Sequence, residues 1–289
     1  MRPSQSLFLD IRGLRYHVRT WGDPSSPKLF LLHGWMDVSA SFQFLVDALQ
    51  RNWYVLAPDW RGYGLTEWPQ DGYWFADYIG DLDALVRALS PDAPIDLVGH
   101  SLGGNVAGMY AGLRPDRVRR VISLEGFGVP TGSFEDAPDK IVKWLDSLFD
   151  PLGLRPFNDL EAAAKRLQKT NPRLSRERAD FLAQHWTKPG PDGTRILQAD
   201  PKHRLPFPSV SHSAEWMAAW KRITAPIMWV IADQSETIKW ATGGSEDEWK
   251  KRVAAVPALV VEHVAGAGHM LQHDQPERVA ELIEKFIRR

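Results

Sequence analysis

The sequence predicts an α/β protein with a mostly parallel sheet and helices on both faces. Two continuous apolar runs, residues 28–34 and 53–59, are typical of strands buried on both faces. Segments with helical apolar spacing, residues 41–50 and 75–89, follow them in alternation. Strand–helix alternation favours parallel pairing, because each helix carries the chain back across the sheet. The 289 residues can bury one large core, as a single domain or as a domain with an insertion.

Most of this alternation lies in the first 125 residues. Residues 7–12 and 14–21 alternate apolar and polar around Gly13, which predicts a hairpin with one solvated face. The elements predicted after it are strand 28–34, helix 41–50 (with Phe44, Leu45, Ala48 and Leu49 at helical spacing), strand 53–59, loop 60–64, helix 75–89, strand 95–98, a helix beginning at Leu102, and strand 118–125.

The alternation breaks between residues 126 and 220. Prolines, charged helical pieces and a Pro-Gly-Pro-Asp-Gly loop at 189–193 replace the strands, with helices predicted at 139–149, 160–169 and 176–186. The strand pattern returns at 225–233, followed by helix 246–256, strand 258–264 and helix 276–289. We therefore expect a core made of residues 1–125 and 221–289, with residues 126–220 as a helical insertion lying over the sheet.

Composition excludes several classes of function. The chain has 35 basic and 36 acidic residues and a net charge of −1, which does not favour nucleic acid or an anionic membrane as partner. It has no cysteine, so disulfides, thiol catalysis and cysteine-bound metals are excluded. No histidine–carboxylate cluster has metal-ligand spacing, and we expect neither metal nor cofactor. The N-terminus resembles no signal peptide, which predicts a cytoplasmic protein. The sequence does not specify the oligomeric state, and it is compatible with a homodimer.

Residues 95–108 contain the motif with the clearest chemistry. An apolar strand leads into Gly-x-Ser-x-Gly at Gly99, Ser101 and Gly103, and a helix of small residues follows. A serine at the apex of such a turn has a strained backbone, and side chains two positions away on either side would clash. The pattern therefore predicts an exposed nucleophilic hydroxyl on Ser101.

Three further motifs accompany the serine turn: His33-Gly34, the run Asp-Trp-Arg-Gly-Tyr-Gly at 59–64, and Gly-Ala-Gly-His-Met at 266–270. With them the chain resembles the α/β-hydrolase superfamily over nearly its whole length outside the insertion. The resemblance is greatest to capped esterases, carbon–carbon-bond hydrolases and serine-hydrolase-like proteins. It implies an eight-stranded sheet, a helical cap between the sixth and seventh strands, and a nucleophile, an acid and a histidine in that chain order.

His269 is the expected base, because it follows the last apolar strand in a glycine-flanked loop, where the family places its histidine. His273 is the rival, although its position near the terminal helix favours a local hydrogen bond. His33 and His100 belong to motifs and are expected to be structural or at the pocket edge. The remaining histidines, expected to be surface or satisfied interior groups, are His17, His185, His203, His212 and His263.

The acid that should orient the histidine has three candidates. The usual family position, after the seventh strand, is occupied by Ser235, with Asp233 two residues earlier and Glu236 one later. Glu125 instead ends the sixth strand, 24 positions after Ser101, as the acid does in some haloalkane dehalogenases. A carboxylate at the end of a buried strand is costly without a partner, so we favour Glu125. Its alternative role is to cap the first turn of the insertion.

The resemblance also implies a substrate-binding loop and an oxyanion hole. The backbone N–H groups of Leu102 and Trp35 are the expected donors, and the Trp35 indole would narrow the pocket. His33 and Gly34 precede Trp35 and complete the expected substrate-binding set. Residues 59 and 61 (Asp59, Arg61) are expected to be a structural pair of the following loop.

A serine nucleophile favours acyl transfer, and it disfavours the dehalogenase and epoxide-hydrolase branches, which use an aspartate. Leu102 also stands where those dehalogenases have a halide-binding tryptophan. Five tryptophans in and after the insertion suggest an apolar or aromatic substrate group or a core of the cap: Trp144, Trp186, Trp216, Trp220 and Trp240. The expected small-molecule substrate is a carboxylic ester or lactone. The alternatives are a vinylogous diketone cleaved at a carbon–carbon bond, and non-catalytic ligand binding.

Overall fold

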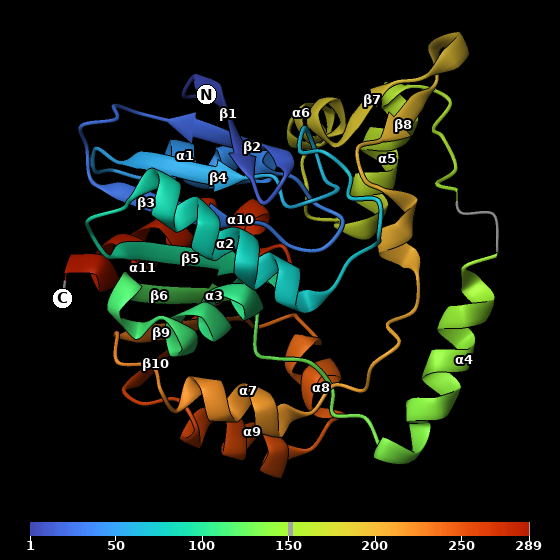
Figure 1. Cartoon of the computed structure of the whole chain (residues 1–289). Helices are drawn as coiled ribbons and strands as arrows, with labels where there is room; N and C mark the ends of the chain where they lie inside the picture. Colours follow the sequence, from blue (N-terminus) through green and yellow to red (C-terminus); the bar gives the residue numbers. More distant parts are fainter. Residues whose placement is uncertain (150–152, 289) are drawn as a thin grey trace.

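A single eight-stranded sheet forms the centre of the computed structural model, which describes residues 1–149 and 153–288 (Figure 1). Its strands are β1 (Ser4–Ile11), β2 (Leu14–Trp21), β3 (Lys28–Leu32), β4 (Tyr54–Pro58), β5 (Ile95–His100), β6 (Val118–Leu124), β9 (Ile227–Ala232) and β10 (Leu259–Val264). They lie in the order β1-β2-β4-β3-β5-β6-β9-β10. Only β2 runs antiparallel to its neighbours, so the predicted mostly parallel sheet and N-terminal hairpin are confirmed.

Helices cover both faces of the sheet (Figure 1). One face carries α2 (Phe75–Leu89), α3 (Leu102–Leu113) and α7 (Ser213–Trp220), and the other carries α1 (Gln43–Ala48) and α11 (Pro276–Arg288). Short helices α8 (Thr237–Thr242), α9 (Glu246–Ala254) and α10 (Leu271–Asp274) follow the last strands, and 3-10 turns lie at Ser39–Phe42, Pro115–Arg117, Phe134–Asp136, Pro191–Gly193 and Pro201–Arg204.

The alternation of side chains along each strand builds the two cores. In β3, Leu29 and Leu31 pack with α1 and α11, whereas Phe30 and Leu32 pack with α2 and α3. All four side chains are fully buried. A strand covered on both faces needs apolar residues at every position, which is why this segment shows no polar alternation.

Between β6 and α7, the described part of the chain forms a layer of short elements beside the carboxyl ends of the strands (Figure 1). Its helices are α4 (Ala137–Ser147), α5 (Leu160–Thr170) and α6 (Arg176–Trp186), and it also contains a hairpin of β7 (Thr187–Pro189) and β8 (Arg195–Leu197). The sequence did not predict this hairpin, because three-residue strands carry no period. Helices α5 and α6 form a small core together with Phe44 of α1, whereas α4 stands apart from the sheet with no buried residue (Figure 1).

Several contacts join this layer to the body of the protein, and one of them is aromatic. The His203 ring stacks between those of Tyr63 and Tyr73, with centroid distances of 3.8 and 3.5 Å. Asp200 N–H donates to the carbonyl of Gly62 at 2.8 Å. Helix α7, the last element before the predicted boundary at residue 220, lies against α3 of the core. The division at residues 126 and 220 stays a prediction.

The predicted terminal helix includes Arg289, which lies outside the described residues. None of the helices in residues 1–149 and 153–288 combines the length and the apolar character that crossing a bilayer requires.

Candidate active site

Ser101 lies at the sharp turn between β5 and α3. Its backbone has φ 52° and ψ −112°, outside the regions that ordinary residues adopt. Its N–H donates to the carbonyl of Leu124 at 2.8 Å, which ties the turn to the end of β6. A Cβ atom on Gly99 would lie 2.2 Å from the Gly103 oxygen, and one on Gly103 would lie 2.1 Å from the Leu32 oxygen. The steric reason for both glycines is therefore visible.

The loop after β3 lies beside this turn. An added Cβ on Gly34 would be 3.3 Å from Ser101 Cβ, so the backbone of the loop passes directly against the serine. His33 fixes the loop: Trp60 N–H donates to its Nε2 at 2.9 Å, and its Nδ1–H donates to the Gly34 carbonyl at 2.8 Å. Burial lowers the pKa of His33 to about 4, which keeps it in this neutral tautomer. His33 is therefore a structural group.

His269 follows β10 and has 43 % of its side chain exposed. Its Nδ1 lies 2.9 Å from Thr237 Oγ1 and 3.4 Å from Glu125 Oε2. Its carbonyl accepts a hydrogen bond from His100 Nε2 at 2.8 Å, so His100, the residue before the serine, holds the backbone of the His269 loop. Among the described residues, no hydrogen bond joins Ser101 Oγ to the imidazole.

Glu125 carries the carboxylate that contacts His269. The residue is 1 % exposed and has φ 57°, a left-handed conformation that turns the side chain from the end of β6 toward β9. Ala232 N–H donates to Oε1 at 2.8 Å, and the Ser235 hydroxyl donates to Oε2. The charged oxygens are thus hydrogen-bonded, as burial requires.

The other two carboxylate candidates point elsewhere. Asp233 is exposed and accepts from Ala267 N–H at 3.3 Å. Glu236 is an exposed residue whose carboxylate lies 3.0 Å from Lys239 Nζ. Of the three candidates, only Glu125 reaches the imidazole of His269.

Sequence reasoning missed two hydroxyl groups at this site. Ser235 Oγ lies 2.9 Å from Thr237 Oγ1, and together they connect Glu125 to His269. The available signal was Ser235 itself, which stands at the usual family position of the acid. Nothing in the sequence distinguishes Thr237 from other loop threonines.

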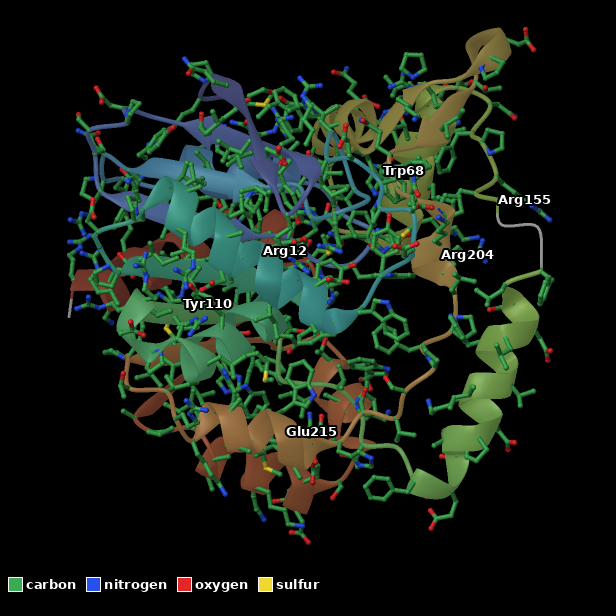
Figure 2. The ribbon with its side chains drawn as sticks, in the orientation of Figure 1. Arg12, Trp68, Tyr110, Arg155, Arg204 and Glu215 are labelled. Carbon is green, nitrogen blue, oxygen red and sulfur yellow. The ribbon has the colours of Figure 1, made fainter. Side chains whose placement is uncertain are left out.

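A cavity of about 540 Å³ opens beside the serine turn. Trp35 and Leu102, the two expected oxyanion-hole residues, line it, whereas Ser101 and His269 are not among its lining residues. The rest of the lining is mainly apolar and aromatic, and includes Tyr73, Trp74, Phe75, Tyr78, Val129, Trp144, Leu148, Leu205, Phe207, Val210 and Trp216. Charged groups are few: Asp71, Lys202 and Glu215, the last labelled beside α7 in Figure 2.

The five tryptophans expected near the substrate divide between several roles. Trp144 and Trp216 line the cavity. Trp186 Nε1–H donates to the carbonyl of Met36 at 2.7 Å and so links α6 to the loop after β3. Trp220 packs on Trp229 in the core, and Trp240 is 57 % exposed away from the cavity.

The expectation of a local hydrogen bond for His273 is wrong. Its Nε2 lies 2.6 Å from the hydroxyl of Ser41, which comes from the other end of the chain. Asp59 and Arg61 also bind separate partners: Asp59 accepts from Ser39 N–H at 2.6 Å, and Arg61 forms a two-pronged contact with Asp81 at 2.6 Å. Long-range contacts of this kind leave no local pattern in a sequence.

A second serine–histidine–aspartate cluster lies on the N-terminal hairpin. His17 is buried, with Nε2 2.9 Å from Ser6 Oγ and Nδ1 2.7 Å from Asp59 Oδ2. Ser6, however, lies within a regular strand, and no cavity residue lies beside it. This cluster has the contacts of a triad without the strained turn or the substrate space, so we assign it a structural role.

Within the described chain, histidine and carboxylate side chains form no group of three or more that could hold a metal ion.

A family model described as "alpha/beta hydrolase fold" matches residues 27–276. The chain is 29 % identical to a "Serine hydrolase-like protein" of Danio rerio, over 93 % of this chain and 84 % of the relative. It is 27 % identical to a "2-(acetamidomethylene)succinate hydrolase" of Mesorhizobium japonicum, over 96 % and 94 %. A solved thioesterase domain from the curacin biosynthetic pathway matches with a TM-score of 0.88 at 25 % identity, over 98 % of this chain and 99 % of that domain. The predicted superfamily and fold class are thus confirmed, and the chain belongs to the alpha/beta hydrolase fold family.

Proposed function

We propose that the protein is a serine hydrolase that forms an acyl-enzyme on Ser101 and acts on a carboxylic ester or lactone with an apolar or aromatic group. The observation that carries the proposal is the strained serine turn, which opens beside a largely aromatic cavity. The membership of a hydrolase family agrees with it.

The proposed chemistry needs four groups at this site. Ser101 Oγ attacks the carbonyl carbon while its proton passes to Nε2 of His269. The N–H groups of Leu102 and Trp35 receive the developing oxyanion; that of Leu102 opens α3 and therefore has no helical partner. His269 then protonates the leaving alkoxide, and water releases the acid. Substrate binding must draw the imidazole toward the serine, a tightening that is common in hydrolases.

The cavity supports the substrate class. Aromatic side chains bury large apolar areas, so a cavity lined mainly by them favours an apolar or aromatic acyl or alcohol group over a sugar or a phosphate. The curated relative named for 2-(acetamidomethylene)succinate suggests that a carboxylate-bearing compound belongs in any substrate panel. Lys202 is the cavity residue that could meet such a group.

The test compares Ser101→Ala with Ser6→Ala on a panel of p-nitrophenyl esters, lactones and dienone acids. Removing a serine nucleophile should lower kcat by on the order of 10⁵- to 10⁶-fold. Ser6→Ala is the matched control, because it removes the serine of the second cluster, and it should keep kcat within about twofold of wild type.

A fluorophosphonate probe adds an independent measurement. It should label wild type and Ser6→Ala at Ser101, as located by peptide mass spectrometry, and leave Ser101→Ala unlabelled. Undiminished turnover by Ser101→Ala would refute the nucleophile assignment. An unlabelled wild type that hydrolyses nothing in the panel would instead favour a non-catalytic, ligand-binding protein.

A further inference from the structure

Two hydroxyl groups lie between the carboxylate and the imidazole. The distance from His269 Nδ1 to Thr237 Oγ1 is 2.9 Å, that of an ordinary hydrogen bond, whereas the distance to Glu125 Oε2 is 3.4 Å. Thr237 Oγ1 lies 2.9 Å from Ser235 Oγ, which in turn bonds Glu125 Oε2. The better-formed path from histidine to acid therefore runs through both hydroxyls.

The protons on this path can be arranged in one direction. An ionised carboxylate only accepts, so the Ser235 hydroxyl must donate to Glu125. Ser235 Oγ then accepts from the Thr237 hydroxyl and also from Thr237 N–H at 3.2 Å. Thr237 Oγ1 is left as an acceptor for Nδ1–H of His269. That tautomer leaves Nε2 free to accept the proton of Ser101, which is what a general base needs.

The exposure of the imidazole makes this path important. The His269 side chain is 43 % exposed, so packing alone does not hold its ring. Glu125, by contrast, is buried and fixed by a backbone donor, Ala232 N–H. A chain of hydrogen bonds polarises its members toward the charged end, so an anchored carboxylate strengthens the last bond to Nδ1.

We propose that Ser235 and Thr237 form a hydroxyl relay, through which the buried Glu125 orients His269. Both are positioning residues, and no proton leaves Nδ1 during the reaction. The proposal rests on the proposed function, because it assigns the relay to the histidine that serves Ser101. The relay also explains how an acid at the end of β6 can serve a histidine whose acid, in most of the family, follows the strand here labelled β9. The hydroxyl of Ser235 stands at that usual position and connects Glu125 to the imidazole through hydrogen bonds.

The test uses Thr237→Val, which removes the hydroxyl and keeps the shape, beside Thr237→Ser, which keeps the hydroxyl. We expect Thr237→Val to lower kcat by on the order of 10²-fold with KM nearly unchanged. The loss should be smaller than the roughly 10⁴-fold loss on replacing a triad acid, because Glu125 stays in place. Thr237→Ser should keep kcat within about threefold. Thr242→Val is the matched control on the same helix: its hydroxyl bonds the Ile238 carbonyl, so kcat should not change.

Ser235→Ala tests the other half of the relay and keeps the proposal testable should Thr237→Val fold poorly. It should lower kcat to a similar degree, and the double variant should be little worse than either single one, since both interrupt one path. Wild-type kcat in either single variant would overturn the relay and leave Glu125 acting through its direct 3.4 Å contact. Failure of the proposed function gives a different result: Ser101→Ala keeps its turnover, or the wild type is neither labelled nor active on the panel.

Discussion

Glu125 has a backbone conformation that few glutamates adopt. A left-handed φ of 57° costs roughly 1–2 kcal/mol for a residue with a Cβ atom. Met36 and Ser101 are also left-handed, with φ of 55° and 52°. Three strained residues thus meet around the serine turn, and strain of this kind persists where the surrounding contacts hold a functional geometry in place.

Replacing Glu125 by glutamine should show whether Glu125 or Asp233 is the acid that orients the histidine. The amide keeps the shape but loses the charge that holds the relay and the imidazole in order, so we expect kcat to fall by about 10⁴-fold. Asp233→Asn should stay within a few-fold of wild type, because within the described residues its carboxylate accepts a hydrogen bond from Ala267 N–H and none from His269. Steady-state kinetics on the best ester of the panel gives both values. A larger loss in Asp233→Asn would reassign the acid.

At the scale of residues, sequence patterns can select side chains that belong to a motif or follow an apolar strand. Ser101, His269 and Glu125 were selected because each ends or follows an apolar strand in a set order. Thr237 could not be selected, because a hydroxyl acquires its role only from the two side chains that the fold brings to it. Ser41, the distant partner of His273, was hidden for the same reason.

At the scale of single elements, helices α3 and α7 approach each other closely at Gly112. A Cβ atom added to Gly112 of α3 would lie 2.0 Å from the carbonyl oxygen of Ala219 in α7. Backbone cannot yield as a side chain can, so the two helix axes approach each other only because this position lacks a side chain. Helix α7 in turn carries Trp216 to the cavity wall.

Gly112→Ala should therefore destabilise the protein, although alanine is the better helix former by about 1 kcal/mol. We expect the free energy of unfolding to fall by about 1–3 kcal/mol from overpacking, measured by urea titration. Gly80→Ala in α2 is the control. There the added Cβ would meet the guanidinium of Arg12 (labelled in Figure 2), which is paired with Asp77 and Asp81 but ends a long side chain and can shift more easily than backbone. Equal stability of Gly112→Ala and wild type would show that the helices can separate at no cost.

Element prediction succeeded where a helix has one apolar side. The bounds of α2 and α6 agree with the predicted 75–89 and 176–186. Helix α7 went unrecognised because four of its eight residues are buried and apolar residues lie nearly all round it, so no stripe marks it. The strands β7 and β8 were missed because three residues cannot show a period of two.

For the molecule as a whole, buried histidines dominate the expected response to acid. Burial lowers the pKa of His33, His185 and His273 to about 4, and that of His203 to about 3. An unfolded histidine binds its proton near pH 6.5, so between pH 6.5 and 4 the unfolded chain holds more protons than the folded one. The contribution of these neutral histidines to the free energy of unfolding is therefore complete above pH 6.5 and is lost as the pH falls toward 4.

Asp37 acts in the opposite sense. Burial raises the pKa of its carboxyl to about 7, so its contribution is present at low pH and is lost as the pH rises from about 4 to 7. The four histidines lose more stability on acidification than Asp37 gains. The thermal unfolding temperature should therefore fall steadily from pH 6.5 to pH 4. Circular dichroism melts across this range would show it, and a flat or rising profile would contradict it.

The order of the strands is the part of the whole fold that residue patterns alone could not supply. Alternation of strands and helices predicted a parallel sheet, but nothing in the sequence analysis indicated that β3 lies between β4 and β5. Strand order depends on which apolar faces meet at long range, and buried strands resemble one another too closely for their sequences to specify neighbours.

The nucleophile, acid, hydroxyls and histidine of the proposed active site follow the carboxyl ends of β5, β6, β9 and β10, four adjacent strands that the chain forms between residues 95 and 264. No contiguous fragment contains all four strands without close to three-fifths of the polypeptide. Turnover is consequently a reporter of the intact tertiary structure: a nascent or proteolysed chain would remain inert until the last of these strands had docked.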